Sequence, residues 1–163
     1  MFAEVMRDDA YRTYRIRLET LLQIPTDASD QDIHELIEAG FSASSVNALC
    51  AMGAISPSGR NLIIPLKTLN SRLARGQQLT LNESDRLFRV THVTAMAETL
   101  LGDNAKAKHW LLKPKESFSG RCPITMLSTY PGTRVVEELL LQVAEGRSFY
   151  PMGHPRSTDG VAT

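Results

Sequence analysis

The spacing of the apolar residues limits the fold of this chain more than any other feature of its sequence. In residues 5–24, Tyr11, Tyr14, Leu18, Leu21 and Leu22 recur every three or four positions, which is the period of an amphipathic helix. Later segments repeat this spacing, and none shows the alternation of apolar and polar residues typical of a strand. The chain also has no internal repeat. We therefore predict an all-α fold.

Residues that favour helix ends divide the chain into short helices. Pro25 should end the first helix, since a proline disfavours the helical conformation of the residue before it. Ser29 is a suitable N-cap for the second helix, and Gly40 is a natural end for it. A serine cap and Gly53 bracket a third. The same reasoning predicts further helices after Ser56-Pro57, over 66–74, over 80–101 with Thr80 or Asn82 as cap, and within 103–113, 123–129 and 132–146.

Charge is balanced over the whole chain but not along it. The 163 residues include 18 lysines and arginines and 18 acidic residues, so the total charge gives no indication of nucleic-acid binding. However, no acidic residue lies between Glu38 and Glu83. This basic sector contains two short helices separated by a tight connection before Pro65, the pattern of a helix-turn-helix.

In a helix-turn-helix, the early residues of the second helix reach the base edges of DNA. Arginine pairs well with guanine and asparagine with adenine, while lysine, serine and threonine suit phosphates. The alternative is a solvated polar helix face, and the pattern alone does not decide between the two. The predicted DNA-binding residues are Arg60, Lys67, Thr68, Asn70, Ser71, Arg72 and Arg75.

The sequence gives no positive sign of catalysis, a metal or a cofactor. The histidines at 34, 92, 109 and 154 lack metal-ligand spacing, and we expect His92 to be a hydrogen-bonded histidine within a helix. Cys50 and Cys122 lie in apolar contexts, and Ser84 has no neighbouring histidine base. No signal peptide begins the chain, and no apolar run approaches the roughly 20 residues that span a bilayer. We expect a cytoplasmic protein that is not an enzyme.

Four segments after residue 80 resemble the toxin-binding domain of Xre/MbcA/ParS antitoxins. They are NESDRLFRV at 82–90, AKHWLLKPKESFSG at 107–120, PITMLST at 123–129, and a G-x-x-x-V at 132–136 followed by EELLLQVAEG. Upstream, GFSASSVNAL and PLKTLNSRLARGQQLTLNESDRL are similar to the Xre-type helix-turn-helix of the same family. The resemblance covers roughly residues 30–147. We therefore expect an N-terminal helix and an Xre-like helix-turn-helix domain over 1–79, a helical toxin-binding domain over 80–147 and a tail over 148–163.

The resemblance further implies the antitoxin of a type II toxin–antitoxin pair whose usual partner is a RES-domain toxin that degrades NAD. Such antitoxins cover the NAD pocket of the toxin with the end of the chain, and repress their own operator, usually as dimers. In this chain the toxin-binding residues are then expected on the exposed face of the last helix and just after it. They are Arg134, Glu137, Glu138, Glu145, Gly146, Arg147, Phe149 and Tyr150.

Two further expectations concern the C-terminal part. Trp110 should be a core anchor that packs with Phe118 and the last helix, and Val135, Val136, Leu139, Leu140 and Val143 should form that helix's buried face. The segment after Gly146 has no apolar period and is expected to be mobile or ordered by a partner. Two alternatives remain open: a stand-alone helix-turn-helix regulator with a C-terminal dimerisation domain, and a small helical enzyme or small-molecule binder.

Overall fold

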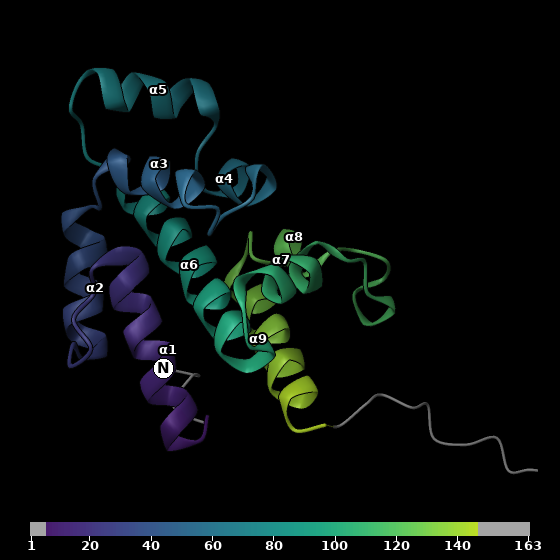
Figure 1. Cartoon of the computed structure of the whole chain (residues 1–163). Helices are drawn as coiled ribbons and strands as arrows, with labels where there is room; N and C mark the ends of the chain where they lie inside the picture. The colour runs from purple at the N-terminus through teal and green to yellow at the C-terminus, as the bar shows by residue number, and fades with distance from the viewer. Residues whose placement is uncertain (1–5, 147–163) are drawn as a thin grey trace, which may run out of the picture.

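The computed structural model describes residues 6–146, and every regular element in that range is a helix (Figure 1). The prediction of an all-α fold is confirmed for this part of the chain. The tail, with Arg147, Phe149 and Tyr150, lies outside the described residues. The helices are α1 Asp8–Leu22, α2 Asp30–Ala39, α3 Ala43–Ala51, α4 Pro57–Ile63, α5 Leu66–Ala74, α6 Leu81–Leu101, α7 Asn104–Leu112, the 3₁₀ turn η2 Glu116–Phe118, α8 Pro123–Met126 and α9 Tyr130–Ala144.

The helix ends follow the local chemistry of the sequence. The Ser29 hydroxyl accepts from the amide of Asp32, and the Asp32 carboxylate accepts from the amide of Ser29, which forms a capping box. Thr80 and Glu83 form a second box at the start of α6. The first helix differs from the prediction: it ends two residues early because Gln23 adopts a left-handed φ of 59°. Ser42 precedes α3 but does not cap it, since its hydroxyl bonds to two neighbouring serine hydroxyls instead.

The long helix α6 is the centre of the fold. In Figure 1, α1 and α2 lie on one side of it, α7 and α9 lie on the other, and α3, α4 and α5 gather at its N-terminal end. It packs against α1, α2, α4, α7 and α9. Every residue from Val90 to Glu98 is buried. Neighbours on all sides exclude water from this part of α6, so Thr91, Thr94 and His92 are interior as well.

The connection between α7 and α9 is compact and sharply turned. Gly120 takes a φ of 79°, which a glycine adopts without strain, and the Lys115 amide donates to the Arg121 carbonyl to close the loop. Leu111 and Phe118 are buried, whereas Trp110 is only half-buried and carries the Lys115 ammonium 4.8 Å from its ring centre. The prediction that Trp110 is a core anchor is therefore wrong. Leu111 and Phe118 are the buried residues here, and Trp110 packs against the core from its edge.

Candidate functional site

The exposed face of α5 brings together four of the predicted DNA-binding residues. Pro65 precedes the helix with a φ of −61°, and the buried Leu69 fixes its inner face. Lys67, Ser71 and Arg75 are exposed and follow one another at four-residue spacing, while Asn70 is exposed beside them. Thr68 is half-buried on the same helix. The outward face thus offers two cations and two short polar side chains, a set that suits phosphates and base edges.

Arg72 differs from these residues because it is engaged within the protein. Its Nε donates to Glu83 Oε1 at 3.2 Å and its Nη2 to Glu83 Oε2 at 3.5 Å, with Nη1 reaching Gln77 at 3.3 Å. The two side chains are 26% and 9% exposed. Burial alone would raise the pKa of Glu83, but hydrogen bonds from Thr80 and Arg72 outweigh it and lower that pKa. Arg72 therefore ties α5 to the start of α6.

Arg60 also lies apart from the α5 face. It is half-buried on α4, and its Nη1 is a buried nitrogen for which the described residues supply no hydrogen-bond partner. Burial raises the pKa of the half-buried Cys50 thiol, and the positive charge of Arg60 opposes that rise. Arg60 was predicted to bind DNA together with the α5 residues because the sequence shows its charge but not its burial.

Residues of the NESDRLFRV segment at 82–90 connect α6 to neighbouring parts of the chain. The Ser84 hydroxyl, fully buried, accepts the amide of Phe41 at 3.0 Å and so fixes the chain entering α3 to α6. Asp85 pairs with Arg89, which also donates to the carbonyl of Leu127 at 3.0 Å before α9 begins. Glu83, Ser84 and Asp85 are consecutive, so their side chains point in different directions around α6, and each contacts a different partner.

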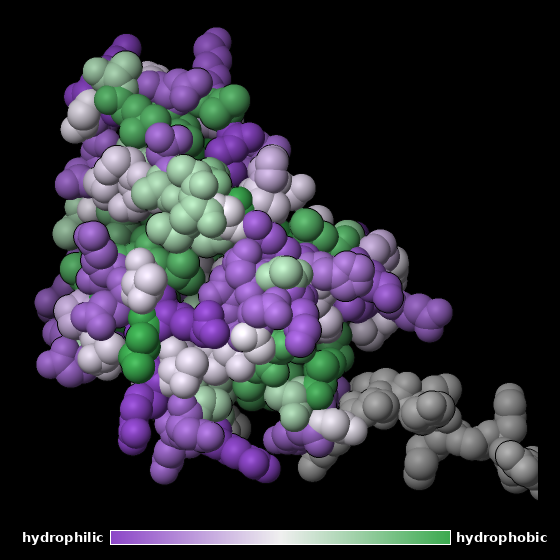
Figure 2. Space-filling model, viewed as in Figure 1, coloured by the Kyte–Doolittle hydropathy of each residue, from purple (hydrophilic) through white to green (hydrophobic). Residues whose placement is uncertain are grey.

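The outward face of α9 is partly apolar. Thr129 caps this helix by accepting from the amide of Gly132. Val136 and Leu140 are buried as predicted, and Leu139 is half-buried. Val135 and Val143 were expected in the buried face as well, but they are 41% and 40% exposed. Val135 is turned about 100° around the helix from the buried Val136 and so faces outward, whereas Val143 lies in the last turn of α9. In Figure 2, apolar side chains are exposed among polar ones over the region of α9.

The predicted toxin-binding residues divide into two groups. Glu138, Glu145 and Gly146 are exposed at or near the outward face of α9, and Arg134 is half-buried. Glu137 is 5% exposed and belongs to the interior, so its assignment to the exposed face was wrong. On a helix, Glu137 follows Val136 and precedes Leu140 by three positions, which places it on the buried side.

Glu137 takes part in a buried hydrogen-bond chain that links three helices. His92 Nε2 lies 2.8 Å from Glu137 Oε1, and His92 Nδ1 lies 2.6 Å from the hydroxyl of Tyr14 on α1. Burial raises the pKa of Tyr14 far above its ordinary value, so its hydroxyl stays protonated and can donate to Nδ1. The Nε2–H then donates to the carboxylate. The expectation that His92 is hydrogen-bonded within a helix is confirmed.

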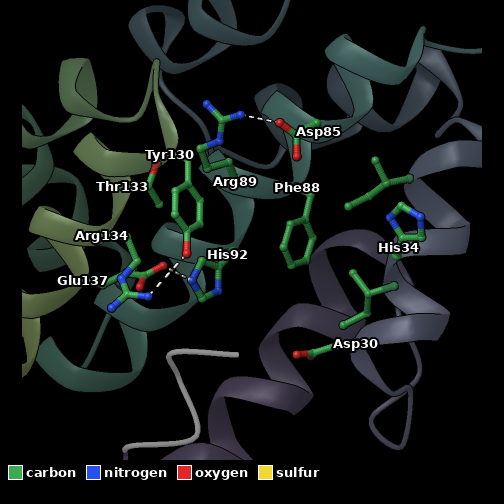
Figure 3. A pocket seen from close by; sticks show the side chains of 12 residues that line it. Asp30, His34, Asp85, Phe88, Arg89, His92, Tyr130, Thr133, Arg134 and Glu137 are labelled. Carbon is green, nitrogen blue, oxygen red and sulfur yellow. Dashed lines mark hydrogen bonds and ion pairs between the residues drawn. The ribbon is translucent and has the colours of Figure 1, made fainter.

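A cavity of about 310 Å³ lies where α2, α6 and α9 meet (Figure 3). Glu137 and His92 line it beside the aromatic rings of Phe88 and Tyr130. The remaining lining residues are Asp30, Ile33, His34, Ile37, Asp85, Arg89, Thr133 and Arg134. Nothing in the sequence pointed to this cavity, because its residues come from three helices separated by long stretches of chain.

No group of three or more histidine, cysteine, aspartate or glutamate side chains within residues 6–146 is placed to hold a metal ion. None of the helices described there is long and apolar enough to cross a membrane.

Comparisons with known proteins all point to Xre-type antitoxins. Residues 96–146 match a family described as the antitoxin Xre/MbcA/ParS C-terminal toxin-binding domain. This range covers the end of α6 and all of α7 to α9. The chain is 56% identical over 146 residues to "Antitoxin Xre" of Pseudomonas putida strain KT2440, covering 90% of this chain and 92% of that protein. It is 28% identical over 113 residues to "Antitoxin Xre" of Yersinia enterocolitica, covering 68% and 76%.

Proposed function

Because the chain belongs to the Xre antitoxin family, we propose that it neutralises a separately encoded RES-domain toxin and represses its own operon. In this proposal the C-terminal helices dock on the toxin and the end of the chain covers the NAD pocket. The helix-turn-helix of α4 and α5 binds the operator. The protein acts as a homodimer, since a symmetric pair of recognition helices reads two half-sites.

The observation that carries the toxin-binding half is the exposed face of α9 within the matched region. Val135 and Val143 are large apolar side chains left 41% and 40% exposed, and Glu138 and Glu145 are exposed on the same helix. Interfaces commonly have an apolar centre with a polar rim. A toxin surface with an apolar patch bordered by lysine or arginine would complement this face. Inhibition would be steric and would require no chemistry from this chain.

The operator-binding half rests on the exposed face of α5. Lys67 and Arg75 supply charge for phosphates, and Asn70 and Ser71 lie between them. Each lost phosphate contact should weaken binding to all DNA sequences and reduce its salt dependence. Loss of Asn70 should instead weaken discrimination between operator and unrelated DNA, because asparagine recognises adenine edges.

The test is NAD hydrolysis by the product of the adjacent reading frame, measured with and without this protein. Inhibition that saturates at a fixed ratio supports the proposal. Val135→Arg should weaken inhibition at least tenfold, because it places a charge at the centre of the docking face. Ile16→Arg is the matched control: Ile16 is 52% exposed on α1, away from the matched region, and its substitution should leave inhibition unchanged.

A chain that ends at Gly146 separates the contribution of the tail. If the end of the chain covers the NAD pocket, this truncation should still bind the toxin but inhibit it poorly. Undiminished inhibition would assign the blocking role to α9. An active neighbour that the full chain neither binds nor inhibits would refute the antitoxin proposal and favour a stand-alone DNA-binding regulator.

A further inference from the structure

The cavity between α2, α6 and α9 is lined by the buried carboxylate of Glu137, and the described residues form a hydrogen bond with only one of its two oxygens. We propose that this cavity binds a small organic cation, an amine, amidine or guanidine carried on a compact aromatic or aliphatic body, with Glu137 as its anion. This inference stands whether or not the chain neutralises a toxin or binds DNA.

The carboxylate of Glu137 is held in place and is incompletely hydrogen-bonded. Its Oε1 accepts from His92 at 2.8 Å, and His92 is held in turn by Tyr14. Its Oε2 is buried, and the part of the chain that the structure describes gives it no hydrogen-bond partner. A buried polar atom left unpaired is costly, more so when it belongs to a charged group. An N–H donor entering the cavity would relieve that cost.

The walls of the cavity suit a flat or apolar body. The Phe88 ring stacks on His92, with centroids 5.7 Å apart and planes 12° apart, so one aromatic face is fixed beside the carboxylate. Tyr130, Ile33 and Ile37 supply further apolar surface. Aromatic faces attract cations, and ligand pockets typically combine such walls with a few polar groups. A volume of about 310 Å³ accommodates a molecule built on a single ring.

The other charges facing the cavity allow a cation to bind near Glu137. Asp85 and Arg89 pair with each other, and Arg89 also donates to a backbone carbonyl, so this pair contributes no net charge. Arg134 extends toward the Tyr130 hydroxyl at 3.4 Å, and Asp30 and His34 line the α2 side (Figure 3). The presence of Arg134 makes an anion the competing ligand, and the test therefore includes one.

The test compares three probes of one shape: benzamidine, neutral benzamide and benzoate. Each is titrated into the full chain, and the backbone amide signals of Phe88 and Thr133 are followed by NMR. Benzamidine should shift both signals and bind at least tenfold more tightly than either other probe. Equal binding of the three, tighter binding of benzoate, or no shift at these residues would overturn the proposal.

Variants link the binding to the cavity. Glu137→Gln keeps the shape and an acceptor for His92 but removes the charge, so benzamidine affinity should fall at least tenfold. Glu116→Gln, which removes an exposed carboxylate on η2, should leave that affinity unchanged. If Glu137→Gln does not fold, Ile37→Trp offers a second test, because its indole should fill the α2 side and abolish binding. Unaltered benzamidine affinity in Ile37→Trp, or in folded Glu137→Gln, would refute the assignment.

Discussion

Replacement of Arg72 by alanine distinguishes a structural joint from a DNA contact. The substitution removes two hydrogen bonds to Glu83 and one to Gln77, and leaves a carboxylate that is 9% exposed with only its Thr80 capping bond. Exposed ion pairs contribute about 0.2–1 kcal/mol, and hydrogen bonds to charged groups about 1.5–3 kcal/mol. With Arg72 26% exposed, a value between these limits applies. We expect a loss of about 1–2 kcal/mol, which lowers the Tm by about 2–8 °C in a chain of this size.

The assay pairs thermal unfolding with titration of operator DNA. Lys67→Ala is the matched control, since Lys67 is exposed on the same helix and has no role in the joint. Lys67→Ala should weaken DNA binding at an unchanged Tm, whereas Arg72→Ala should lower the Tm and weaken DNA binding through the displaced helix. Unfolding of Arg72→Ala at the wild-type temperature would show that the Arg72–Glu83 pair does not stabilise the contact between α5 and α6.

Three further changes test the packing and the electrostatics. Tyr14→Phe removes the hydrogen-bond donor to His92 and should lower the free energy of unfolding in urea by about 1–3 kcal/mol. Tyr11→Phe, at a half-buried ring, should lower it less. Equal losses would contradict the buried hydrogen-bond chain of Tyr14, His92 and Glu137. Gly132→Ala would place a Cβ 2.0 Å from the Met126 carbonyl oxygen and should cost at least about 2 kcal/mol. Gly59→Ala should cost less, because its nearest atom is Ile55 Cγ2, at 2.8 Å and in a side chain rather than in the backbone; the reverse order would be inconsistent with this packing. Because the pKa of Glu83 is lowered in the folded protein, this carboxylate stabilises the fold above its ordinary pKa of 4.5, and the stabilisation is lost as pH falls through the folded-state pKa. Glu83→Gln should therefore flatten the acid side of the curve of unfolding free energy against pH. An unchanged slope would count against the Arg72–Glu83 pair.

Local signals in the sequence predicted most helix ends, because capping depends on residues three or four positions apart. Ser29, Ser56 and Thr80 cap as their types suggest, and Gly40 follows α2 with a φ of 87°. Gln23 and Ser42 departed from the prediction. The end of α1 depends on the left-handed φ of Gln23, and the missing cap of α3 depends on the bonds between the Ser42 hydroxyl and neighbouring serines. Residue preferences determine neither.

The site was less predictable because burial depends on contacts between distant segments. Glu137 looks like any surface carboxylate until α1 and α6 bring Tyr14 and His92 to it. The available signal was its place on the helical wheel beside Val136 and Leu140. Arg72 and Arg60 likewise read as members of a basic surface, since the sequence shows their charge but not their partners. The exposed residues of α5 and α9 remain predictions as contact sites.

The most direct test of the antitoxin proposal is a titration of the adjacent gene's purified product with this protein, followed by its NAD hydrolysis. We expect activity to fall to the background level at a fixed molar ratio, and Val135→Arg to shift the curve to higher concentration while Lys67→Ala does not. Full NAD hydrolysis at a large excess of the wild-type chain would contradict the account.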